Sequence, residues 1–400
     1  MIENFSLDKT YKYLLISLAF LLPLTVFGAN VIIVFIVVLW LFSGNYRSKY
    51  TQIISSKLLL ASLIFYGLHI LGMLWTSDLS WGFKILHKMW YFLLLLPILF
   101  TITKKEYFSK CVTAFTFAIL LTEIMSYLIW FELITPFKNA TVQNPTPFMS
   151  HVSYNPILAF AIYLVMHQVF FNKDLSKVKF FWYSFFSITM SINMFITGGR
   201  AGQVMYFAML SILIFQFFNF EKIKSFFAII IVIPAIFFTA YQASPLFKER
   251  VDLAVSDVVT YEKTTNTSVG KRLTFAINSW ELIKENPLIG VGTGDFPSEY
   301  NKINTANKSN TPNASNPHNM YTLVLVQLGL IGLISMLSIF YYQIKLSFNS
   351  SNKFLKDLGI TLPVLFLVVM FSDSYLLGHY TTLMFVFFSA FLYKDSEKIY

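Results

Sequence analysis

The stretch that decides the fold is MYTLVLVQLGLIGLISMLSIFYYQI, residues 320–344, which contains no charged side chain. A helix of about 20 apolar residues crosses roughly 30 Å of hydrocarbon, so this stretch is long enough to span a membrane. Similar stretches recur along the chain, and none shows the alternation typical of barrel strands. The sequence therefore predicts an all-α polytopic membrane protein with about twelve spans. They are residues 11–28, 29–43, 58–75, 89–103, 109–131, 154–171, 179–197, 201–219, 225–241, 320–344, 357–375 and 381–393.

The composition supports a membrane protein. Of the 400 residues, 56% are hydrophobic and 12% charged, more apolar surface than a soluble domain hides from water. The net charge of +10 comes from cations scattered singly through loops, which argues against nucleic acid as a partner. The lone Cys111 excludes an internal disulfide and a cysteine metal cluster.

The first two apolar stretches allow two interpretations, one overlong helix or a hairpin that turns at Gly28, Ala29 and Asn30. Lys and Arg residues flank the pair at both ends, with Lys9 and Lys12 before it. Both ends therefore belong on the same side of the membrane, which favours the hairpin. The first stretch, which lacks a convincing cleavage site, is interpreted as an uncleaved span.

The loops alternate in basic content. One side collects 18 of the 30 Lys and Arg residues, among them Lys398, whereas the short loops of the other side hold only Lys84, Lys88, Lys138 and Arg200. The positive-inside rule places the richer side, with both termini, in the cytoplasm. We therefore expect spans in 1–241, a long outward loop in 242–319, and further spans with a short cytoplasmic tail in 320–400.

The outward loop has its own pattern. Residues Leu273, Ala276, Ile277, Trp280 and Ile283 recur at helical spacing, Thr267 or Ser268 can cap the start, and Asn286-Pro287 ends the run. This predicts an amphipathic helix that lies on the membrane surface or packs against the spans. A G-x-G-x-G run at 290–294 is interpreted as a flexible turn in preference to a phosphate nest, and an Asn-rich stretch at 301–316 is expected to be mobile.

Three residues are candidates for chemistry in this outward region. Arg200 stands in the turn TGGRAG, residues 197–202, where its guanidinium suits phosphate and the glycines admit a bulky ligand; an interfacial anchor is the alternative. Arg272 lies at the edge of the apolar stripe, which would hold its guanidinium at the boundary between water and lipid; a solvated surface charge is the alternative. His318 precedes the tenth span and either acts on a hydroxyl proton or caps the helix.

Other polar residues carry weaker signals. Lys84 and Lys88 lie on one helical face. They either add positive charge around the entrance to the site or simply extend to the lipid headgroups. Glu123 and Asp373 are costly in lipid, so each either lines the cleft or pairs with a buried arginine. The histidines show no metal-ligand spacing, and no metal site is predicted.

Three motifs together resemble the O-antigen ligase family, within the superfamily that also holds O-antigen polymerases and bacterial O-oligosaccharyltransferases. They are TGGRAG at 197–202, NPLIGVGTGDF at 286–296 and PHNMY at 317–321, in this order and on one side of the membrane. The resemblance extends over the whole predicted topology, and its motifs concentrate in residues 190–345.

The resemblance implies an inverting, metal-independent glycosyl transfer at the periplasmic face, without a cofactor. The donor would be a glycan on undecaprenyl diphosphate, and the acceptor a sugar hydroxyl of lipid A-core. The family's catalytic residues would be Arg200, Arg272 and His318. Lys84, Lys88, Gly199 and Asn319 are expected to bind substrate.

Physical chemistry agrees with these roles, because negative charge grows on the departing diphosphate and preorganised cations stabilise it. Rival interpretations are an O-antigen polymerase, a protein O-glycosyltransferase, and a lipid-linked glycan flippase or solute transporter. A transporter would more often show internal repeats and ionisable residues near the bilayer middle.

Overall fold

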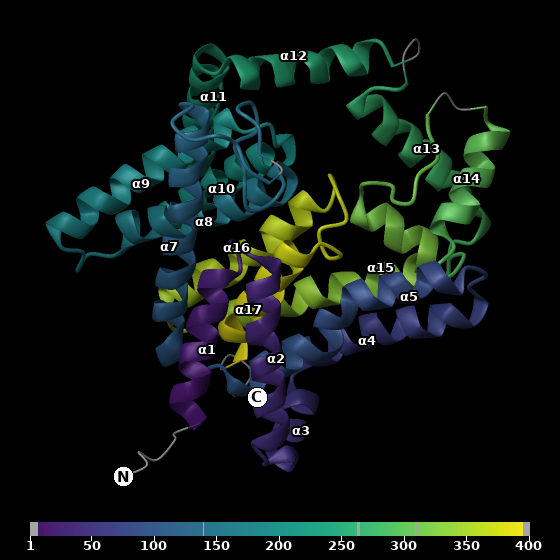
Figure 1. Ribbon diagram of the computed structural model, residues 1–400, viewed down its shortest axis with the longest axis horizontal. Helices are drawn as coiled ribbons and strands as arrows, with labels where there is room; N and C mark the ends of the chain where they lie inside the picture. Colours follow the sequence, from purple (N-terminus) through teal and green to yellow (C-terminus); the bar gives the residue numbers. More distant parts are fainter. Residues whose placement is uncertain (1–6, 139, 262–264, 309–310, 395–400) are drawn as a thin grey trace.

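The computed structural model describes residues 7–138, 140–261, 265–308 and 311–394, and every regular element in these residues is a helix (Figure 1). Asn310 of the Asn-rich stretch and Lys398 lie outside them. The first elements are α1 (Leu7–Leu21), α2 (Val26–Phe42), α3 (Tyr46–Ser55), α4 (Lys57–Gly72), η1 (Met73–Trp75), α5 (Leu79–Trp90), the π-helix η2 (Tyr91–Leu95), α6 (Leu96–Ile102), α7 (Lys105–Trp130) and α8 (His151–Phe171). The others are α9 (Lys177–Ile196), α10 (Arg200–Phe217), α11 (Lys222–Ala243), α12 (Pro245–Val259), α13 (Ser268–Glu285), α14 (Phe296–Ala306), α15 (Met320–Phe348), α16 (Lys353–Val369) and α17 (His379–Leu392).

The chain is a polytopic membrane protein, but twelve spans are not confirmed. Among the described residues, 7 helical stretches are long and apolar enough to cross a membrane, or up to 8 if the bent pair α2 and α3 counts as one span. The seven are Lys57–Trp75, Leu79–Ile102, Lys105–Trp130, His151–Phe171, Arg200–Phe217, Lys222–Ala243 and Met320–Phe348. The other predicted stretches also form helices (α1, α2, α9, α16 and α17), which are shorter or less apolar.

The N-terminal hairpin forms, but its turn is not at Gly28, Ala29 and Asn30, which all lie within α2. α1 ends at Leu21, two residues before Pro23, because a proline interrupts the hydrogen bonds of a continuing helix. Thr25 then starts α2, since its hydroxyl accepts a hydrogen bond from the Gly28 N–H at 3.3 Å.

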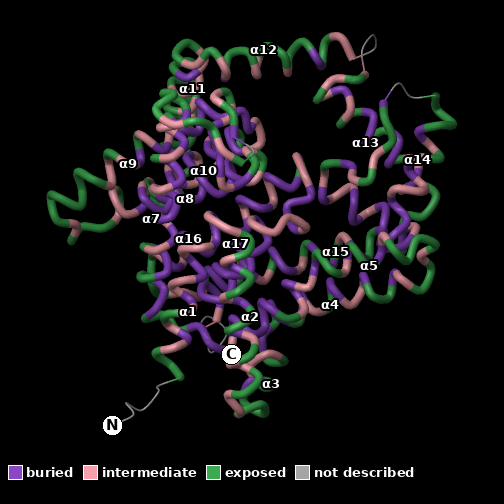
Figure 2. The backbone as a smooth tube through the Cα atoms, viewed as in Figure 1, coloured by how far each residue is buried: buried purple, intermediate pink, exposed green. Residues whose placement is uncertain are grey.

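The interior is built around α8, where 72% of the most apolar 18 residues are buried. It packs against α9, α10, α16 and α17, whereas α11 lies at the periphery, with 11% of its most apolar 18 residues buried (Figure 2). The approach of α8 to α10 depends on Gly202: a Cβ there would lie 2.0 Å from the Asn155 Cβ. Two spans thus meet backbone to backbone below the turn that carries Arg200.

The G-x-G-x-G run is not the flexible turn that its composition suggested. It pairs with a break in α15, where Gly329 has φ 60° and ψ −157°. Val291 N–H donates to the Val326 carbonyl at 2.8 Å, and Leu330 N–H donates to the Pro287 carbonyl at 2.8 Å. The Thr293 hydroxyl donates to the His69 carbonyl of α4 at 2.7 Å. The run is a fixed insert between α4 and α15 whose amide groups are engaged by protein, and it anchors the end of α13.

The amphipathic helix of the outward region forms as α13, with the expected cap. The Thr267 hydroxyl accepts from the Gly270 N–H at 3.0 Å, and the helix ends before Asn286. Its apolar stripe, however, faces outward: Ile277 is 52% and Trp280 58% exposed. The buried face carries Phe275, Leu282 and polar groups. The helix packs against the span α15, as one of the two predicted placements has it, and leaves part of its apolar stripe exposed.

The Asn-rich stretch is ordered where it is described. Asn301 and Asn304 belong to α14, and Asn304 is 4% exposed. Asn304 accepts a hydrogen bond from the Asn278 amide of α13 at 3.1 Å and donates to the Thr311 carbonyl at 3.0 Å. Because the asparagines recur every third residue, several fall on one helical face, where they join α13, α14 and the following loop.

Candidate active site

Arg200 is the first residue of α10 and follows a tight, well-held turn. The Thr197 hydroxyl donates to the Asn155 side-chain oxygen at 2.9 Å, and the Gly198 N–H donates to the Asn144 side-chain oxygen at 3.0 Å. No side chain among the described residues caps the start of α10, and the first N–H groups of a helix have no partner within it, which favours an anion there. In addition, Arg200 Nη1 is buried without a hydrogen-bond partner among the described residues.

Gly199 lies beside Arg200, but its lack of a side chain serves helix packing. A Cβ on Gly199 would lie 2.6 Å from the Asn155 side-chain nitrogen and 2.8 Å from the His151 carbonyl oxygen. The glycine therefore gives α8 room against the turn. Its backbone still lines the cavity beside Arg200, so the predicted contact with substrate stays a prediction.

A first cavity of about 400 Å³ brings Arg200 and Arg272 together. Helices α8, α10, α12 and α13 and the α16–α17 loop surround it. The wall includes a third arginine that the sequence did not single out, Arg250 of α12. The charged groups that act most strongly on Arg200 are Arg250, Asp257 and Arg272. Three guanidinium groups outnumber the two nearby carboxylates, Asp257 and Asp373, so the cavity is electrostatically suited to an anion.

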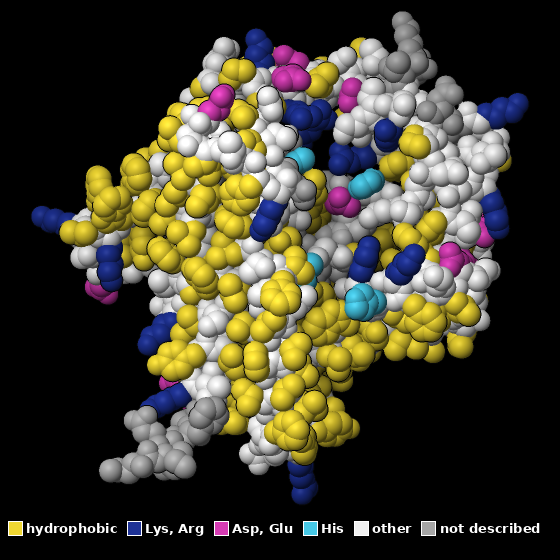
Figure 3. Space-filling view, viewed as in Figure 1, with side chains coloured by type: hydrophobic (Ala, Val, Ile, Leu, Met, Phe, Trp, Pro, Cys, Tyr) yellow, Lys and Arg dark blue, Asp and Glu magenta, His cyan; other side chains and the backbone are white. Residues whose placement is uncertain are grey.

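A second cavity, of about 590 Å³, adjoins the first. It is lined by Lys271, Phe275 and His318, together with residues 312–316 of the Asn-rich stretch. Ser268 and Arg272 line both cavities. The structure therefore places Arg272 at the junction between a cavity with the arginines and a cavity with the histidine. Figure 3 shows basic, acidic and histidine side chains gathered around a hollow in a mainly apolar surface.

His318 is fixed by its backbone and by its ring. It has φ 51°, a left-handed conformation that is uncommon outside glycine, and its N–H donates to the Asn316 side-chain oxygen at 2.9 Å. Its ring stacks on Phe275 of α13, with the centroids 6.0 Å apart. His318 Nδ1 lies 3.3 Å from Asp373 Oδ1. With Nδ1 directed at a carboxylate, Nε2 is the nitrogen left to accept a proton.

Asp373 lies in the loop after α16, beyond the spans. Burial raises the pKa of Asp373, but the hydrogen bond and charge of His318, the Ser374 N–H and the charge of Arg272 together lower it below its ordinary value of 3.8. The carboxylate is therefore ionised at neutral pH. Asp373 itself lines neither cavity, but it contacts His318, which lines the second, and it lies within the electrostatic influence of Arg272.

The remaining predicted residues lie differently. Asn319 caps α15, accepting from the Thr322 N–H at 3.1 Å and donating to the Phe371 carbonyl at 3.3 Å. Lys84 and Lys88 are exposed on α5, which begins at Leu79, before the predicted span at 89–103. They line a separate hollow of about 480 Å³. They line neither the cavity of Arg200 nor that of His318, so the structure does not bring them to Arg200.

Glu123 is 2% exposed inside α7 and has no hydrogen-bonded partner for either oxygen among the described residues. It lines neither cavity, and none of the ion pairs between described residues includes it. Within the same residues, no group of three or more His, Cys, Asp or Glu side chains is placed to hold a metal ion.

Comparison with known proteins identifies the segment that carries this site. The family model described as "O-Antigen ligase" matches residues 185–337. This segment belongs to the O-antigen ligase family. It runs from the middle of α9 into α15 and includes Arg200, Arg250, Arg272 and His318. The O-antigen ligase family lies in the ligase and polymerase superfamily of glycosyltransferase-like membrane enzymes.

A protein of Haemophilus influenzae (strain Rd), named only as an uncharacterized protein, is 29% identical to this chain over 163 residues. The similar stretch covers 38% of this chain and 40% of the relative. The chain therefore matches well under two thirds of that relative's length.

Proposed function

We propose that the protein is an O-antigen ligase. It transfers a glycan from undecaprenyl diphosphate to a sugar hydroxyl of lipid A-core, at the periplasmic face of the bacterial inner membrane. The observation that carries the proposal is the junction at Arg272, where an arginine-lined cavity adjoins a histidine-lined one. A diphosphate donor fits the first cavity and a hydroxyl acceptor the second.

The donor's diphosphate binds Arg200 and Arg272 in this proposal. Guanidinium forks match phosphate oxygens, and the uncapped start of α10 adds backbone N–H groups. Because the buried Nη1 of Arg200 has no partner among the described residues, a phosphate oxygen would satisfy a group that is otherwise costly to bury. Lys84 and Lys88 would meet the donor only on its approach, from their separate hollow.

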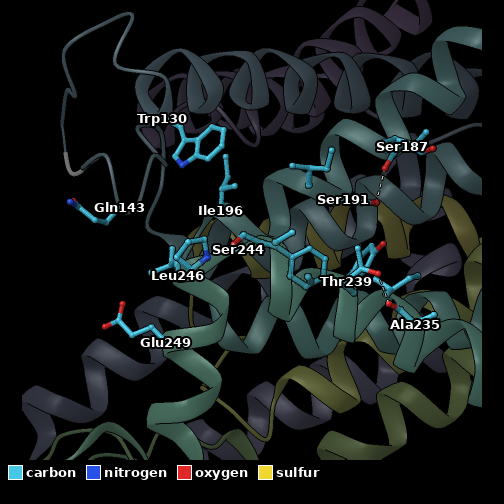
Figure 4. A pocket seen from close by; sticks show the side chains of 18 of the residues that line it. Trp130, Gln143, Ser187, Ser191, Ile196, Ala235, Thr239, Ser244, Leu246 and Glu249 are labelled. Carbon is cyan, nitrogen blue, oxygen red and sulfur yellow. Dashed lines mark hydrogen bonds between the residues drawn. The ribbon is translucent and has the colours of Figure 1, made fainter.

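The polyprenyl tail has a suitable groove in a cavity of about 850 Å³ (Figure 4). Its walls come mainly from α9, α11 and α12. The hydroxyls of Ser191 and Thr239 donate to carbonyls of their own helices, which leaves a mostly apolar lining. Glu249 of α12 lines this groove, and the next residue, Arg250, lines the arginine cavity. Both cavities therefore reach α12 at neighbouring residues, and in this proposal the lipid tail lies in the first cavity with its diphosphate in the second.

Transfer then proceeds by displacement at the anomeric carbon. The acceptor oxygen forms a bond to that carbon from the face opposite the diphosphate, and the bond from carbon to the diphosphate oxygen breaks with its electron pair. His318 Nε2 accepts the acceptor's proton, which later passes to water. Arg200 and Arg272 neutralise the charge that grows on the departing diphosphate, so no metal ion or cofactor is invoked.

The proposed orientation rests on the charge of the loops. The basic loops lie in the cytoplasm together with both termini, and the segment from 242 to 319 lies in the periplasm. The exposed apolar stripe of α13 supports this placement, since a helix with one apolar face suits the surface of the outer leaflet. Lipid A-core would then reach His318 from the same leaflet or from the periplasm.

A deletion strain separates the possible activities. Loss of a ligase should leave bare lipid A-core in a lipopolysaccharide gel and long polymer on undecaprenyl diphosphate in the lipid extract. A polymerase mutant should show core with one repeat unit, a flippase mutant should retain its intermediate in the inner leaflet, and loss of a protein glycosyltransferase should leave lipopolysaccharide normal.

Complementation then tests the residues. Wild-type protein should restore the polymer on core, whereas Arg200→Ala, Arg272→Ala and His318→Ala should not, at equal membrane abundance. Lys248→Ala is a matched control, because Lys248 is an exposed cation of α12 that lines neither arginine cavity. Full activity in any two of the three site variants would refute the assignment.

A further inference from the structure

The short helix α12 turns a single cation toward the site. Its less exposed residues recur three and four positions apart and so share one face: they are Leu246, Phe247, Arg250, Val251, Ala254 and Asp257. Lys248 and Glu249 are exposed. An arginine on the packed face of a helix loses hydration that it would keep on the outer face, so its position calls for a partner.

The start of α12 is firmly attached to the spans. The Ser244 hydroxyl donates to the Phe195 carbonyl at 2.7 Å and accepts from the Phe247 N–H at 3.2 Å. Phe247 is 3% exposed, and its ring meets those of Phe195 and Phe237 at centroid distances of 5.0 and 5.4 Å. Arg250 follows one turn later, so its backbone is held relative to α9 and α11.

Among the described residues, no carboxylate pairs with Arg250. Its Nε is buried without a hydrogen-bond partner, and none of the ion pairs between described residues includes it. One of its terminal nitrogens lies 3.5 Å from the position of a Cβ built on Gly198, so the guanidinium rests against the turn before Arg200. Asp257, two turns along α12, receives the Val269 N–H at 3.3 Å.

The charges of the cavity match the reaction better than they match the resting donor. A diphosphate that links a lipid to a sugar carries two negative charges, and it gains a third when the bond to the sugar breaks. Arg200 and Arg272 are enough for the first two. The third guanidinium repels its neighbours until the additional charge appears, and so it favours the transition state over the bound donor.

We propose that Arg250 is a third phosphate-binding arginine of this site, one that stabilises the charge of the departing polyprenyl diphosphate. This inference rests on the proposed function. It assigns to α12 a direct part in the transfer step and in the retention of the diphosphate product.

The test uses full-length protein in lipid nanodiscs with the lipid-linked donor and lipid A-core. We expect Arg250→Gln to lower kcat about 10-fold to 100-fold, the range for loss of one hydrogen bond to a charged group, with a smaller change in the KM for donor. Arg250→Lys should recover part of the rate, since it restores charge without the fork. Lys248→Gln on the same helix is the control and should match wild type.

Product affinity supplies a readout that a structural role would not change. Polyprenyl diphosphate and polyprenyl monophosphate are used as competing ligands. Arg250→Gln should weaken inhibition by the diphosphate by about the same factor as kcat, and inhibition by the monophosphate much less.

Wild-type kcat in Arg250→Gln, or equal weakening of both competing ligands, would overturn the role of Arg250. Arg200→Ala is measured in parallel. If it abolishes transfer while Arg250→Gln does not lower it, only the further inference fails. If Arg200→Ala and a second of the three site variants transfer normally, the site assignment of the proposed function fails.

Discussion

Replacement of Asp373 by asparagine tests how His318 is prepared for its role. The variant keeps the size of the side chain and removes the charge that faces His318 Nδ1. A hydrogen bond to a charged group contributes about 1.5 to 3 kcal/mol. The separation here is 3.3 Å, longer than the usual distance of about 2.7 to 2.9 Å for such bonds, and the His318 side chain is 45% exposed. The lower end of the range therefore applies, and about 1.5 kcal/mol corresponds to a roughly tenfold loss.

The assay is initial-rate transfer by purified protein in nanodiscs, with donor and acceptor varied separately. We expect Asp373→Asn to lower kcat about tenfold with little change in the KM for donor, because the aspartate acts through His318. Asp373→Glu should recover part of the rate. Asp252→Asn is the control. It removes a carboxylate of α12 that accepts a hydrogen bond from the Tyr241 hydroxyl of α11. An unchanged kcat in Asp373→Asn would refute the role of the pair.

The same variant has a signature in stability. Because the folded protein lowers the pKa of Asp373 from 3.8, its carboxylate stabilises the fold at pH values above 3.8. This contribution is lost as the pH falls through the lowered value. The stability difference between wild type and Asp373→Asn should therefore be full at neutral pH and shrink in strong acid. A difference that grows on acidification would contradict the sign of the shift.

Three further predictions concern packing and charge. Gly202→Ala should lower the free energy of unfolding by about 1 to 3 kcal/mol, because its Cβ would lie 2.0 Å from the Asn155 Cβ of α8. Gly67→Ala is the control, since a Cβ there meets nothing within 4 Å. Equal thermal unfolding curves for the two variants would contradict this packing. Gly329→Ala should disrupt the paired insert, since its φ is 60° and its Cβ would lie 2.3 Å from the Leu288 carbonyl carbon; unchanged hydrogen exchange at 287–294 would oppose this. The double variant Lys84→Gln, Lys88→Gln should slow donor binding only at low salt, because both lysines are exposed and salt screens exposed charges. A lower kcat at high salt would contradict a role confined to the approach of the donor.

Local signals made several features predictable from sequence. The cap at Thr267 and the end before Asn286 gave the bounds of α13, because helix ends follow short-range chemistry. The break near Pro23 could have been found in the same way, since a proline outweighs small and polar residues as a helix terminator.

Other features depend on which surfaces meet. The apolar stripe of α13 is visible in sequence, but both a protein core and a membrane accept apolar residues, so the pattern does not tell which one the stripe faces. The length of an apolar run likewise predicts a helix more reliably than a complete crossing: α17 is apolar and buried, yet only 14 residues long.

The site was predictable only in part. Arg200, Arg272 and His318 stand in recognisable motifs, whereas Arg250 lies among Lys248, Glu249 and Asp252 and reads as part of a solvated helix. Its place became evident once α12 was seen to pack through Phe247. The glycines beside Arg200 illustrate the converse, since the space they leave is occupied by Asn155.

The most direct measurement of the central claim is photo-crosslinking of a polyprenyl diphosphate that carries its reactive group beside the diphosphate. Our account predicts crosslinked peptides from the start of α10 and from α13, competed by unlabelled diphosphate and lost in Arg200→Ala. Crosslinks confined to α5 or to cytoplasmic loops, with none in these two helices, would contradict it.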